Sequence, residues 1–193
     1  ILECARQAIT SNGYEALTMK DLAAASDVSV KTLYNLYSSK DELLLAAVVD
    51  LLADLAEQPE VQSTEPGVAR LLANVQATSR QVVATPEYAD TMARALFQAG
   101  KDHRLVDVLL GATREGIQTQ LEAAQQQGEL LPQVDIQKTA TLLTGHQWSV
   151  VLMWSKGLLN LEEFEQQAQR SQLQTLIPLC SDEIRARLES QLW

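Results

Sequence analysis

The chain has 193 residues, of which 46% are hydrophobic, and its formal net charge is −10. No stretch approaches the roughly 18–20 consecutive apolar residues of a membrane span, and the helical start lacks the zones of a signal peptide, so we expect a cytoplasmic globular protein. The acidic excess argues against nucleic acid as a partner of the chain as a whole, and residues 1–45 hold four basic and six acidic side chains.

The first predicted elements are three short helices. Apolar residues at helical spacing predict a helix over 1–12 that stops at Gly13. A capping-box pattern from Thr18 to Asp21 opens a second helix, and Ser29 caps a third. The inward face of the third helix is predicted to consist of Val30, Leu33 and Tyr37.

A second capping box, from Ser39 to Glu42, opens a long connecting helix. The polar segment 58–67 (QPEVQSTEPG) holds two of the five prolines and is interpreted as a linker. Further helices, punctuated by Pro and Gly, are predicted over about 67–84, 86–100, 102–127, 134–157, 161–179 and 182–191. The chain is therefore predicted to be all-α, with a small three-helix head over 1–45 and a larger helical bundle over 46–193.

The head has the pattern of a helix-turn-helix, in which two short helices flank the turn 26–28 (Ser-Asp-Val) and Val28 is the buried turn residue. In that motif the second helix enters the major groove of DNA and its N-terminal residues meet the base edges. Lys31 and Asn35 carry suitable donors, and Lys40 at a helix start suits a phosphate. The alternative is a tight helical corner with solvated polar side chains. The predicted DNA-contacting residues are Thr18, Met19, Ser29, Val30, Lys31, Thr32, Tyr34, Asn35 and Lys40.

From Ile1 to about Leu55 the sequence resembles the N-terminal domain of the TetR family of bacterial transcriptional regulators. The matching run is NGYEALTMKDLAAASDVSVKTLYNLYSSKDELLLAAV. Its Asn-Gly-Tyr, Asp-Leu-Ala-Ala, Val-Ser, Thr-Leu-Tyr and Ser-Lys-Asp-Glu-Leu-Leu segments fall in the family's order and spacing. The rest of the chain matches loosely, through its helical layout and the phrase 128–130 (Gly-Glu-Leu). The resemblance implies a DNA-binding domain over 1–45 and an effector-binding and dimerisation domain over 46–193.

Three positions in the head depart from the family pattern. Asp27 stands where the family often has Gly, Leu36 where a basic residue or His is common, and Lys31 where a small residue is common. The family usually carries a basic arm ahead of its first helix, whereas this chain begins inside that helix, so we expect residues ahead of Ile1 that restore positive charge. The departures leave the expected fold unchanged and concern the base preference.

No other pattern indicates chemistry at a site. His103 and His146 are far apart and lack Cys or carboxylate neighbours at metal-ligand spacing. The segment 111–116 (GATREG) lacks the Lys of a phosphate loop and lies in the middle of a predicted helix. Cys4 and Cys180 are isolated thiols, typical of core residues in a reducing compartment. We therefore expect no metal, no cofactor and no enzymatic activity.

The helix predicted over 134–157 is apolar on two faces and so requires two partners. One stripe consists of Ile136, Ala140, Leu143, Val151 and Trp154, and the other of Leu142, His146, Ser149 and Met153. The next helix is a candidate neighbour through Leu161, Phe164, Ala168, Leu176 and Ile177. In the TetR family the last long helices pair across a two-fold axis, so the resemblance implies a homodimer through 134–180. The alternative is that both faces are internal.

Residues 68–154 also supply large apolar side chains and a few polar groups of the kind that line ligand pockets. The candidate pocket residues are Leu72, Val75, Tyr88, Met92, Leu96, Phe97, Gln98, Leu109, His146, Gln147, Trp148 and Met153. Taken singly, each is ordinary core packing, but the resemblance assigns this domain to effector binding. Few charged residues lie on these faces, so we expect a small, mainly apolar effector.

These observations predict a one-component transcriptional repressor that binds a palindromic DNA operator as a homodimer and releases it when a small molecule binds. The helix that joins the head to the bundle, over 40–57, is the expected transmitter. The alternative is an all-helical ligand-binding or scaffold protein of the same fold that does not recognise an operator.

Overall fold

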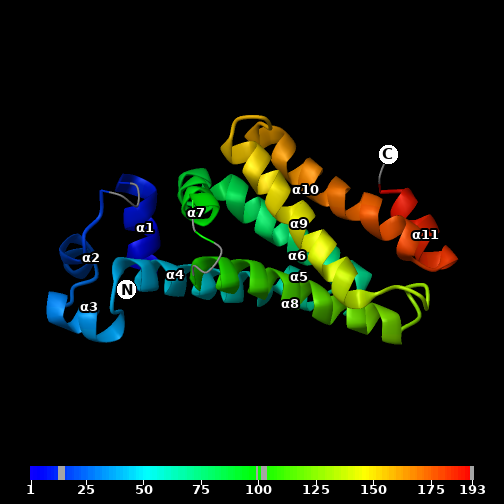
Figure 1. The fold of residues 1–193 in the computed structure, drawn as a ribbon, viewed down its shortest axis with the longest axis horizontal. Coiled ribbons are helices and arrows are strands. Elements are labelled where there is room, and N and C mark those ends of the chain that lie inside the picture. The colour runs from blue at the N-terminus through cyan, green and yellow to red at the C-terminus, as the bar shows by residue number, and fades with distance from the viewer. Residues whose placement is uncertain (13–15, 99, 101–103, 192–193) are drawn as a thin grey trace.

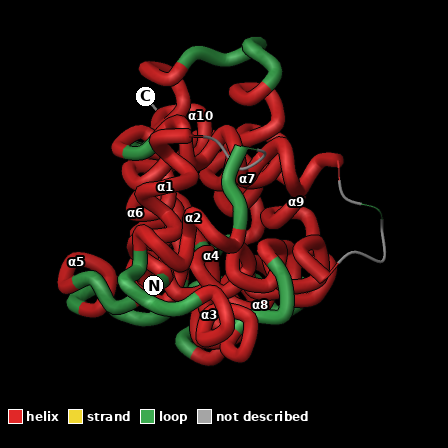
Figure 2. The backbone as a smooth tube through the Cα atoms, turned by 90° about the vertical axis from the view of Figure 1, so that its left-hand side faces the viewer, coloured by secondary structure: helices red, strands yellow, loops and turns green. Residues whose placement is uncertain are grey.

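The computed structural model describes residues 1–12, 16–98, 100 and 104–191, with the side chains of Ala56 and Gln98 excluded. Within these residues the backbone consists of helices and loops (Figure 2), with one isolated bridge between Leu130 and Cys180. The all-α prediction is confirmed. The helices are α1 (Leu2–Asn12), α2 (Met19–Ala25), α3 (Val30–Leu36), α4 (Lys40–Ala56), α5 (Pro59–Gln62), α6 (Val68–Ala84), α7 (Pro86–Gln98), α8 (Arg104–Gln126), α9 (Ile136–Ser155), α10 (Leu161–Leu176), the 3-10 helix η1 (Ile177–Leu179) and α11 (Asp182–Glu189).

The molecule is elongated, with α2 and α3 at one end and α11 at the other (Figure 1). Helix α4 leads from the head into the body, where it contacts α6 and α8. Helices α6, α8, α9 and α10 form the body, and α1 packs against both α4 and α7. The predicted boundary between residues 45 and 46 therefore falls inside α4, which belongs to both parts.

The predicted caps begin the head helices, with one difference. Thr18 Oγ1 accepts the N–H of Asp21 at 3.2 Å, and Asp21 Oδ2 accepts the N–H of Thr18 at 3.0 Å, which completes the first capping box. Ser39 Oγ accepts the N–H of Glu42 at 3.1 Å. The Glu42 carboxylate does not return to Ser39; it accepts the N–H of Ser38 at 3.1 Å instead. In the second capping box the backbone N–H that Glu42 accepts therefore belongs to Ser38 and not to Ser39.

The segment 58–67 is more ordered than a linker. It contains α5, and Val61 in that turn is buried. Arg70 of α6 donates to the carbonyls of Thr64, at 2.8 Å, and Gln62, at 3.0 Å. The sequence prediction was wrong here because one apolar residue among polar ones gives no periodic signal, although its burial fixes the turn.

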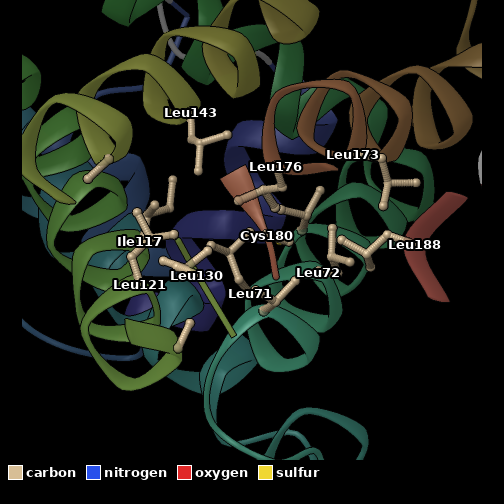
Figure 3. Close-up of a cluster of buried hydrophobic side chains, with 14 of the residues drawn as sticks. Leu71, Leu72, Ile117, Leu121, Leu130, Leu143, Leu173, Leu176, Cys180 and Leu188 are labelled. Atoms are coloured by element: carbon tan, nitrogen blue, oxygen red, sulfur yellow. The ribbon is translucent and has the colours of Figure 1, made fainter. Parts of the chain in front are cut away.

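The body core joins α6, α8, α9, α10 and α11 (Figure 3), and its leucines include some of the most completely buried side chains of the described chain. Buried Gln172 of α10 donates to the carbonyl of Leu143 in α9 at 3.1 Å, which fixes the register of these two helices. Cys180 lies in the same core, where burial raises the pKa of its thiol to about 11 and so disfavours the reactive thiolate. The labelled residues of Figure 3 are Leu71, Leu72, Ile117, Leu121, Leu130, Leu143, Leu173, Leu176, Cys180 and Leu188.

Glu129, in the loop between α8 and α9, caps α6 from a distant part of the sequence. Its Oε2 accepts the N–H of Val68 at 2.8 Å, where a helix start leaves backbone donors without partners. Gly67 precedes Val68 with φ of 119°, and a Cβ at Gly67 would meet the Glu129 carboxylate. Arg187 of α11 lies 3.9 Å from the same carboxylate. Glu129 therefore connects the start of α6 to the end of the body.

The core of the head continues into the body. Its buried side chains from α1 to α4 share one cluster with residues of α7 and the first turns of α8. The body residues in this cluster are Tyr88, Met92, Leu96, Leu105 and Leu109. The head is therefore not an isolated unit, and a change in α7 acts directly on the surface against which the head packs.

Candidate functional site

The α2-turn-α3 segment has the geometry of a helix-turn-helix. Asp27 in the turn adopts a φ of 52°, in the left-handed region that Gly enters at the lowest cost. Partly buried Val28 packs against the head core, and its N–H bonds the carbonyl of Ala23 at 3.0 Å. Ser29 Oγ accepts the N–H of Thr32 at 3.0 Å and so caps α3. The turn therefore forms as predicted, with Asp in place of Gly.

Helix α3 is held by one fully buried side chain and exposes most of the others. Leu33 is buried in the head core, whereas Lys31, Thr32 and Asn35 are exposed and Tyr34 is 51% exposed. These four side chains are free to meet a ligand as large as a DNA duplex. The inward face was partly mispredicted, because Val30 at the helix start is 38% exposed.

The two predicted contact residues at the start of α2 differ in accessibility. Thr18 is exposed and uses its hydroxyl in the capping box with Asp21. Met19 is only 7% exposed and packs in the head core. Its side chain faces inward because α2 packs against α1. The predicted DNA contact by this side chain therefore does not fit the structure.

The start of α4 is tied to both the head and the body. Lys40 Nζ donates to the carbonyl of Leu17 at 3.1 Å, so this ammonium supports the head structure. Glu42 forms an ion pair of 2.9 Å with Arg104 at the start of α8. The pKa of Glu42 lies below its usual value, chiefly because its carboxylate accepts hydrogen bonds from Ser38. A phosphate contact by Lys40 stays a prediction.

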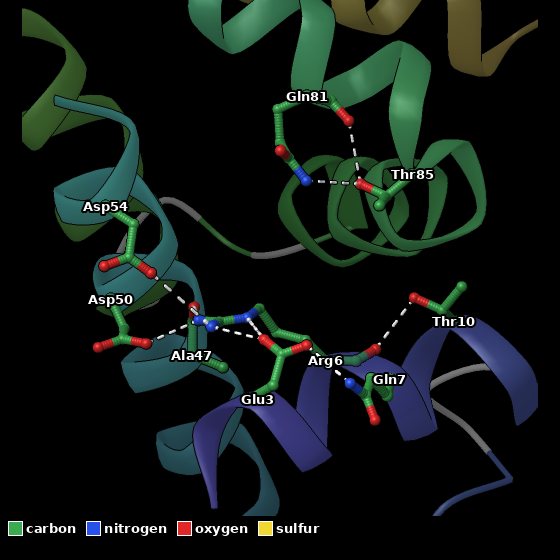
Figure 4. Close-up of polar contacts among 9 residues, drawn as sticks. All are labelled: Glu3, Arg6, Gln7, Thr10, Ala47, Asp50, Asp54, Gln81 and Thr85. Atoms are coloured by element: carbon green, nitrogen blue, oxygen red, sulfur yellow. Dashed lines mark hydrogen bonds and ion pairs between the residues drawn. The ribbon is translucent and has the colours of Figure 1, made fainter. Parts of the chain in front are cut away.

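A second tie joins α1 to α4 through Arg6 (Figure 4). Its guanidinium donates to Asp50 at 2.7 Å and to the carbonyl of Ala47 at 3.2 Å, while Glu3 accepts from it at 2.8 Å. Hydrogen bonding to Arg6 is the main cause that lowers the pKa of Glu3. This cluster fixes how the first helix of the head lies on α4.

A cavity of about 280 Å³ lies where the head meets the body. Its wall comes from five helices: α4, α6, α7, α8 and α9. The volume is near the lower end of the range of about 300–1,000 Å³ typical of ligand pockets. The described lining residues are Val48, Leu51, Leu52, Leu55, Leu71, Asn74, Val75, Ala77, Thr78, Gln81, Val82, Thr85, Tyr88, Ala89, Met92, Ala93, Leu109, Ala112, Thr113, Gly116, Ile117, Gln120, Gln147, Trp148 and Val151.

About half of the predicted pocket residues lie at this cavity. The structure brings together Val75, Tyr88, Met92, Leu109, Gln147 and Trp148. The prediction does not hold for Leu72, Leu96, Phe97, His146 and Met153. Leu72 and Leu96 are buried in the two cores, the ring of Phe97 meets Trp148 edge-on, and Met153 packs on the body core. His146 turns to α10, where its Nδ1 lies 2.9 Å from Thr175 Oγ1. The side chain of Gln98 and all of His103 lie outside the described residues.

The sequence prediction missed the α4 wall of the cavity and the polar side chains of α6. The α4 wall escaped notice because its leucines read as an ordinary connecting helix. The polar side of α6 did carry a signal: Asn74, Thr78, Gln81 and Thr85 recur at helical spacing on a helix that is otherwise largely apolar. A polar stripe of this kind on a helix inside a bundle indicates contact with polar groups, such as those of water or a ligand in a cavity.

Tyr88 connects the cavity with the head. Its ring lines the cavity, but its hydroxyl is buried and has no hydrogen-bond partner among the described residues. Burial raises the pKa of this phenol, and the charges of Arg6 and Glu3 act on it with smaller effects. The side chain therefore reaches from the cavity wall toward the α1 surface of the head.

The outer face of α9 exposes two leucines among small and polar residues, and no other described helix covers it. Leu142 is 50% exposed, and Ser149 and Leu152 share its exposed side together with Gly145. The predicted second stripe was therefore shifted, because His146 and Met153 turn inward. The first stripe and α10 pack together as predicted, with Ala140, Leu143, Phe164 and Leu176 buried.

Other chemistry is not indicated within the described residues. No group of three or more His, Cys, Asp or Glu side chains there is arranged to hold a metal ion. No described helix combines the length and the apolar character that a membrane crossing requires.

Residues 1–47 match the family model of bacterial regulatory proteins of the tetR family. A search of curated proteins found no match to the chain. The matched residues are the head and the first part of α4, so this comparison concerns the part of the chain that carries the helix-turn-helix.

Solved structures match over nearly the whole chain. A TetR-family transcriptional regulator from Pectobacterium atrosepticum is 21% identical with a TM-score of 0.69, over 94% of this chain and 92% of that one. SmeT, the repressor of the multidrug efflux pump SmeDEF of Stenotrophomonas maltophilia, is 16% identical with a TM-score of 0.67, over 95% and 90%. FadR from Bacillus subtilis, solved in complex with stearoyl-CoA, is 15% identical with a TM-score of 0.66, over 87% and 93%.

At these identities the solved structures establish the fold, and the family model establishes the head. The head, over residues 1–47, therefore matches the tetR family of bacterial regulatory proteins, and the chain as a whole has the fold of these solved regulators.

Proposed function

We propose that this regulator is a repressor that binds a palindromic operator as a homodimer and releases it when a small, mainly apolar effector enters the cavity. The observation that carries the proposal is the position of the cavity: α4 and α7 form part of its wall, and the same helices hold the head. An effector that needs more room than the cavity offers must therefore displace the surface on which the head packs.

The exposed side of α3 supports operator recognition. Lys31 and Asn35 can read base edges, the methyl group of Thr32 can meet a thymine methyl, and the Tyr34 hydroxyl can bond a phosphate oxygen. The head holds more acidic than basic side chains, but charges farther than about 10 Å from a phosphate are largely screened at physiological ionic strength. Local contacts by these four side chains can therefore outweigh the acidity of the chain.

The outer face of α9 supports the homodimer. An exposed helix face that contains Leu142, Gly145 and Leu152 allows close approach of a second helix, and covering it removes apolar area from water. Two copies related by a two-fold axis would present their α3 helices about 34 Å apart, or a multiple of the groove repeat, to a palindromic site. A protein that acts on an operator is expected to work in the cytoplasm, where bacterial DNA lies.

Two of the solved relatives bear on the finer parts of the proposal. SmeT is a repressor, and the Bacillus subtilis FadR was solved in complex with stearoyl-CoA, so a chain of this fold can take a ligand. A ligand can shift the equilibrium between bound and released states only if it prefers one of them. We infer that the effector prefers the arrangement in which α4 is displaced and the two α3 helices no longer match the operator.

The test is fluorescence anisotropy with the promoter DNA beside the protein's own gene. The dimer should bind it in a salt-dependent manner, and Lys31→Ala or Asn35→Ala should relax discrimination by about 1–3 kcal/mol if the contact is bidentate. Arg114→Ala, at an exposed basic residue of α8 outside both the head and the proposed dimer face, is the control and should bind as the parent does. A parent chain without salt-sensitive DNA binding would favour the alternative, a helical ligand-binding or scaffold protein of the same fold.

A further inference from the structure

Some polar side chains around the cavity already form hydrogen bonds within the protein, and others do not. We propose that the effector is an uncharged molecule with a hydrogen-bonding group, such as a carboxamide, that is held by the side-chain amides of Asn74 on α6 and Gln147 on α9. This inference rests on the proposed function, because it assumes that the cavity is the effector site.

The cavity offers no compensating charge. None of its described lining residues is Asp, Glu, Lys, Arg or His. The polar groups are amides, hydroxyls and the indole N–H of Trp148, which donates to the Thr113 hydroxyl at 3.3 Å. Moving an ion from water into such surroundings without a counter-charge costs several kcal/mol. An uncharged ligand avoids this cost, so the lining selects against both anions and cations.

Most of the polar lining is engaged within the protein. The hydroxyls of Thr78, Thr85 and Thr113 each donate to the backbone carbonyl four residues earlier, at 2.9, 3.0 and 2.8 Å. The amide of Gln81 donates to the Thr85 hydroxyl at 3.1 Å. The amide oxygen of Gln120 accepts a backbone N–H before α6 at 3.2 Å. These groups are therefore largely satisfied before any ligand arrives.

Two lining amides have no hydrogen bond within the part of the chain that the structure describes. Asn74 and Gln147 are half-buried, on helices that form different walls of the cavity. A side-chain amide offers two donors and an acceptor, so it matches a neutral group that also donates and accepts. The Tyr88 hydroxyl also has no partner among the described residues, but it has almost no accessible surface and so cannot hydrogen-bond to an effector in the cavity.

The charge preference of the site follows from the same geometry. An anion would find amide N–H donors and a cation would find amide oxygens, but either would lie in a largely apolar cavity with no charge to balance it. A carboxamide of the same length makes the same hydrogen bonds without that cost. Affinity should therefore follow the neutral form of the ligand, whichever hydrocarbon body it carries.

Isothermal titration with three probes of equal chain length tests this: octanamide, octanoate and octylammonium, near neutral pH. A carboxyl with a pKa of about 4–5 is protonated in less than about 1% of molecules there, so octanoate should bind about 100-fold more weakly than octanamide. Lowering the pH by one unit should strengthen octanoate about tenfold and leave octanamide unchanged.

Substitutions test the two amides. Asn74→Leu and Gln147→Leu keep similar side-chain volumes and should each weaken octanamide about tenfold, the value of one hydrogen bond. Gln137→Leu, an exposed amide on α9 away from the cavity, is the matched control and should bind like the parent. Gln147→Glu should reverse the charge preference and strengthen octylammonium by tenfold or more, a gain that misfolding cannot produce.

Each outcome bears on the proposal. If octanoate or octylammonium binds the parent as tightly as octanamide, the cavity is an effector site but the inference is wrong. If both leucine variants bind octanamide like Gln137→Leu, the amides are not the binding groups. If none of the three probes binds, the cavity does not take an effector of this class and the inference is wrong, whereas operator binding by the parent tests the proposed function separately.

Discussion

At the end of the body that carries α11, five leucines from α8 to α11 pack with at most 1% of their surface exposed, whereas at the junction with the head five helices surround a cavity of about 280 Å³. We call the first region the distal core; it consists of Leu121, Leu143, Leu173, Leu176 and Leu188. Both regions are built from amphipathic helices of similar composition. We infer that the tightly packed end contributes most to the stability of the fold, whereas the cavity at the junction leaves room for a change that reaches the head.

The largest expected effect separates the two regions directly. Leu143→Ala in the distal core should lower the free energy of unfolding by about 2–5 kcal/mol, because well-packed neighbours cannot close the space it leaves. Met92→Ala in the cavity wall should cost clearly less, since Met92 already borders empty space. Urea denaturation measures both. Equal losses would mean that the junction is packed as tightly as the distal core.

The second largest loss of stability is expected at Glu129, which links the start of α6 to α11. Glu129→Ala removes the acceptor of the Val68 N–H and the partner of Arg187, and should cost about 1.5–3 kcal/mol, as for hydrogen bonds to charged groups. Glu122→Ala removes only an exposed contact to Gln118 and should stay within about 0.5 kcal/mol. Similar thermal midpoints for the two variants would contradict the capping role of Glu129.

A smaller and opposite effect is expected on α8. Gly116→Ala and Gly111→Ala each replace a helix-interior glycine with open space around it, so both should stabilise by about 0.5–1 kcal/mol. Only Gly116 lines the cavity, so only its new methyl group should weaken effector binding. Titration of both variants with octanamide checks this. A matching loss of binding in Gly111→Ala would show that the effect is not local to the cavity.

The smallest effect concerns pH and the tie between α1 and α4. Hydrogen bonding to Arg6 lowers the pKa of Glu3 in the folded chain, so its contribution to stability is present above the unfolded pKa of about 4.3 and is lost as pH falls through the folded value. Glu3→Gln should therefore lose less stability than the parent between about pH 5 and pH 3.

Urea midpoints across this pH range measure the difference. Glu65→Gln, at an exposed glutamate with no ion pair among the described residues, is the control and should follow the parent. A parent and a Glu3→Gln variant with the same acid sensitivity would show that the Arg6 cluster contributes nothing to the junction.

Much of the fold followed from the sequence because its causes are local. Thr18, Ser29 and Ser39 begin helices through hydrogen bonds that span three residues, and apolar spacing alone sets most helix ranges to within a few residues. The helix-turn-helix is equally local, and so the exposed side of α3 was predicted correctly apart from Val30. Met19 was misplaced because its burial depends on how α2 lies against α1, which is a tertiary property.

The cavity could be predicted only in part. It is the space left between five helices, and its lining runs from Val48 to Val151, so no local pattern defines it. The α4 leucines line it only because α4 crosses α6 and α8 in the folded chain. Likewise, Glu129 caps α6 across 61 positions of sequence. Helix starts and apolar faces are local properties and can be read from the sequence, whereas the faces that pack together and those that enclose a cavity depend on how distant helices meet in the folded chain.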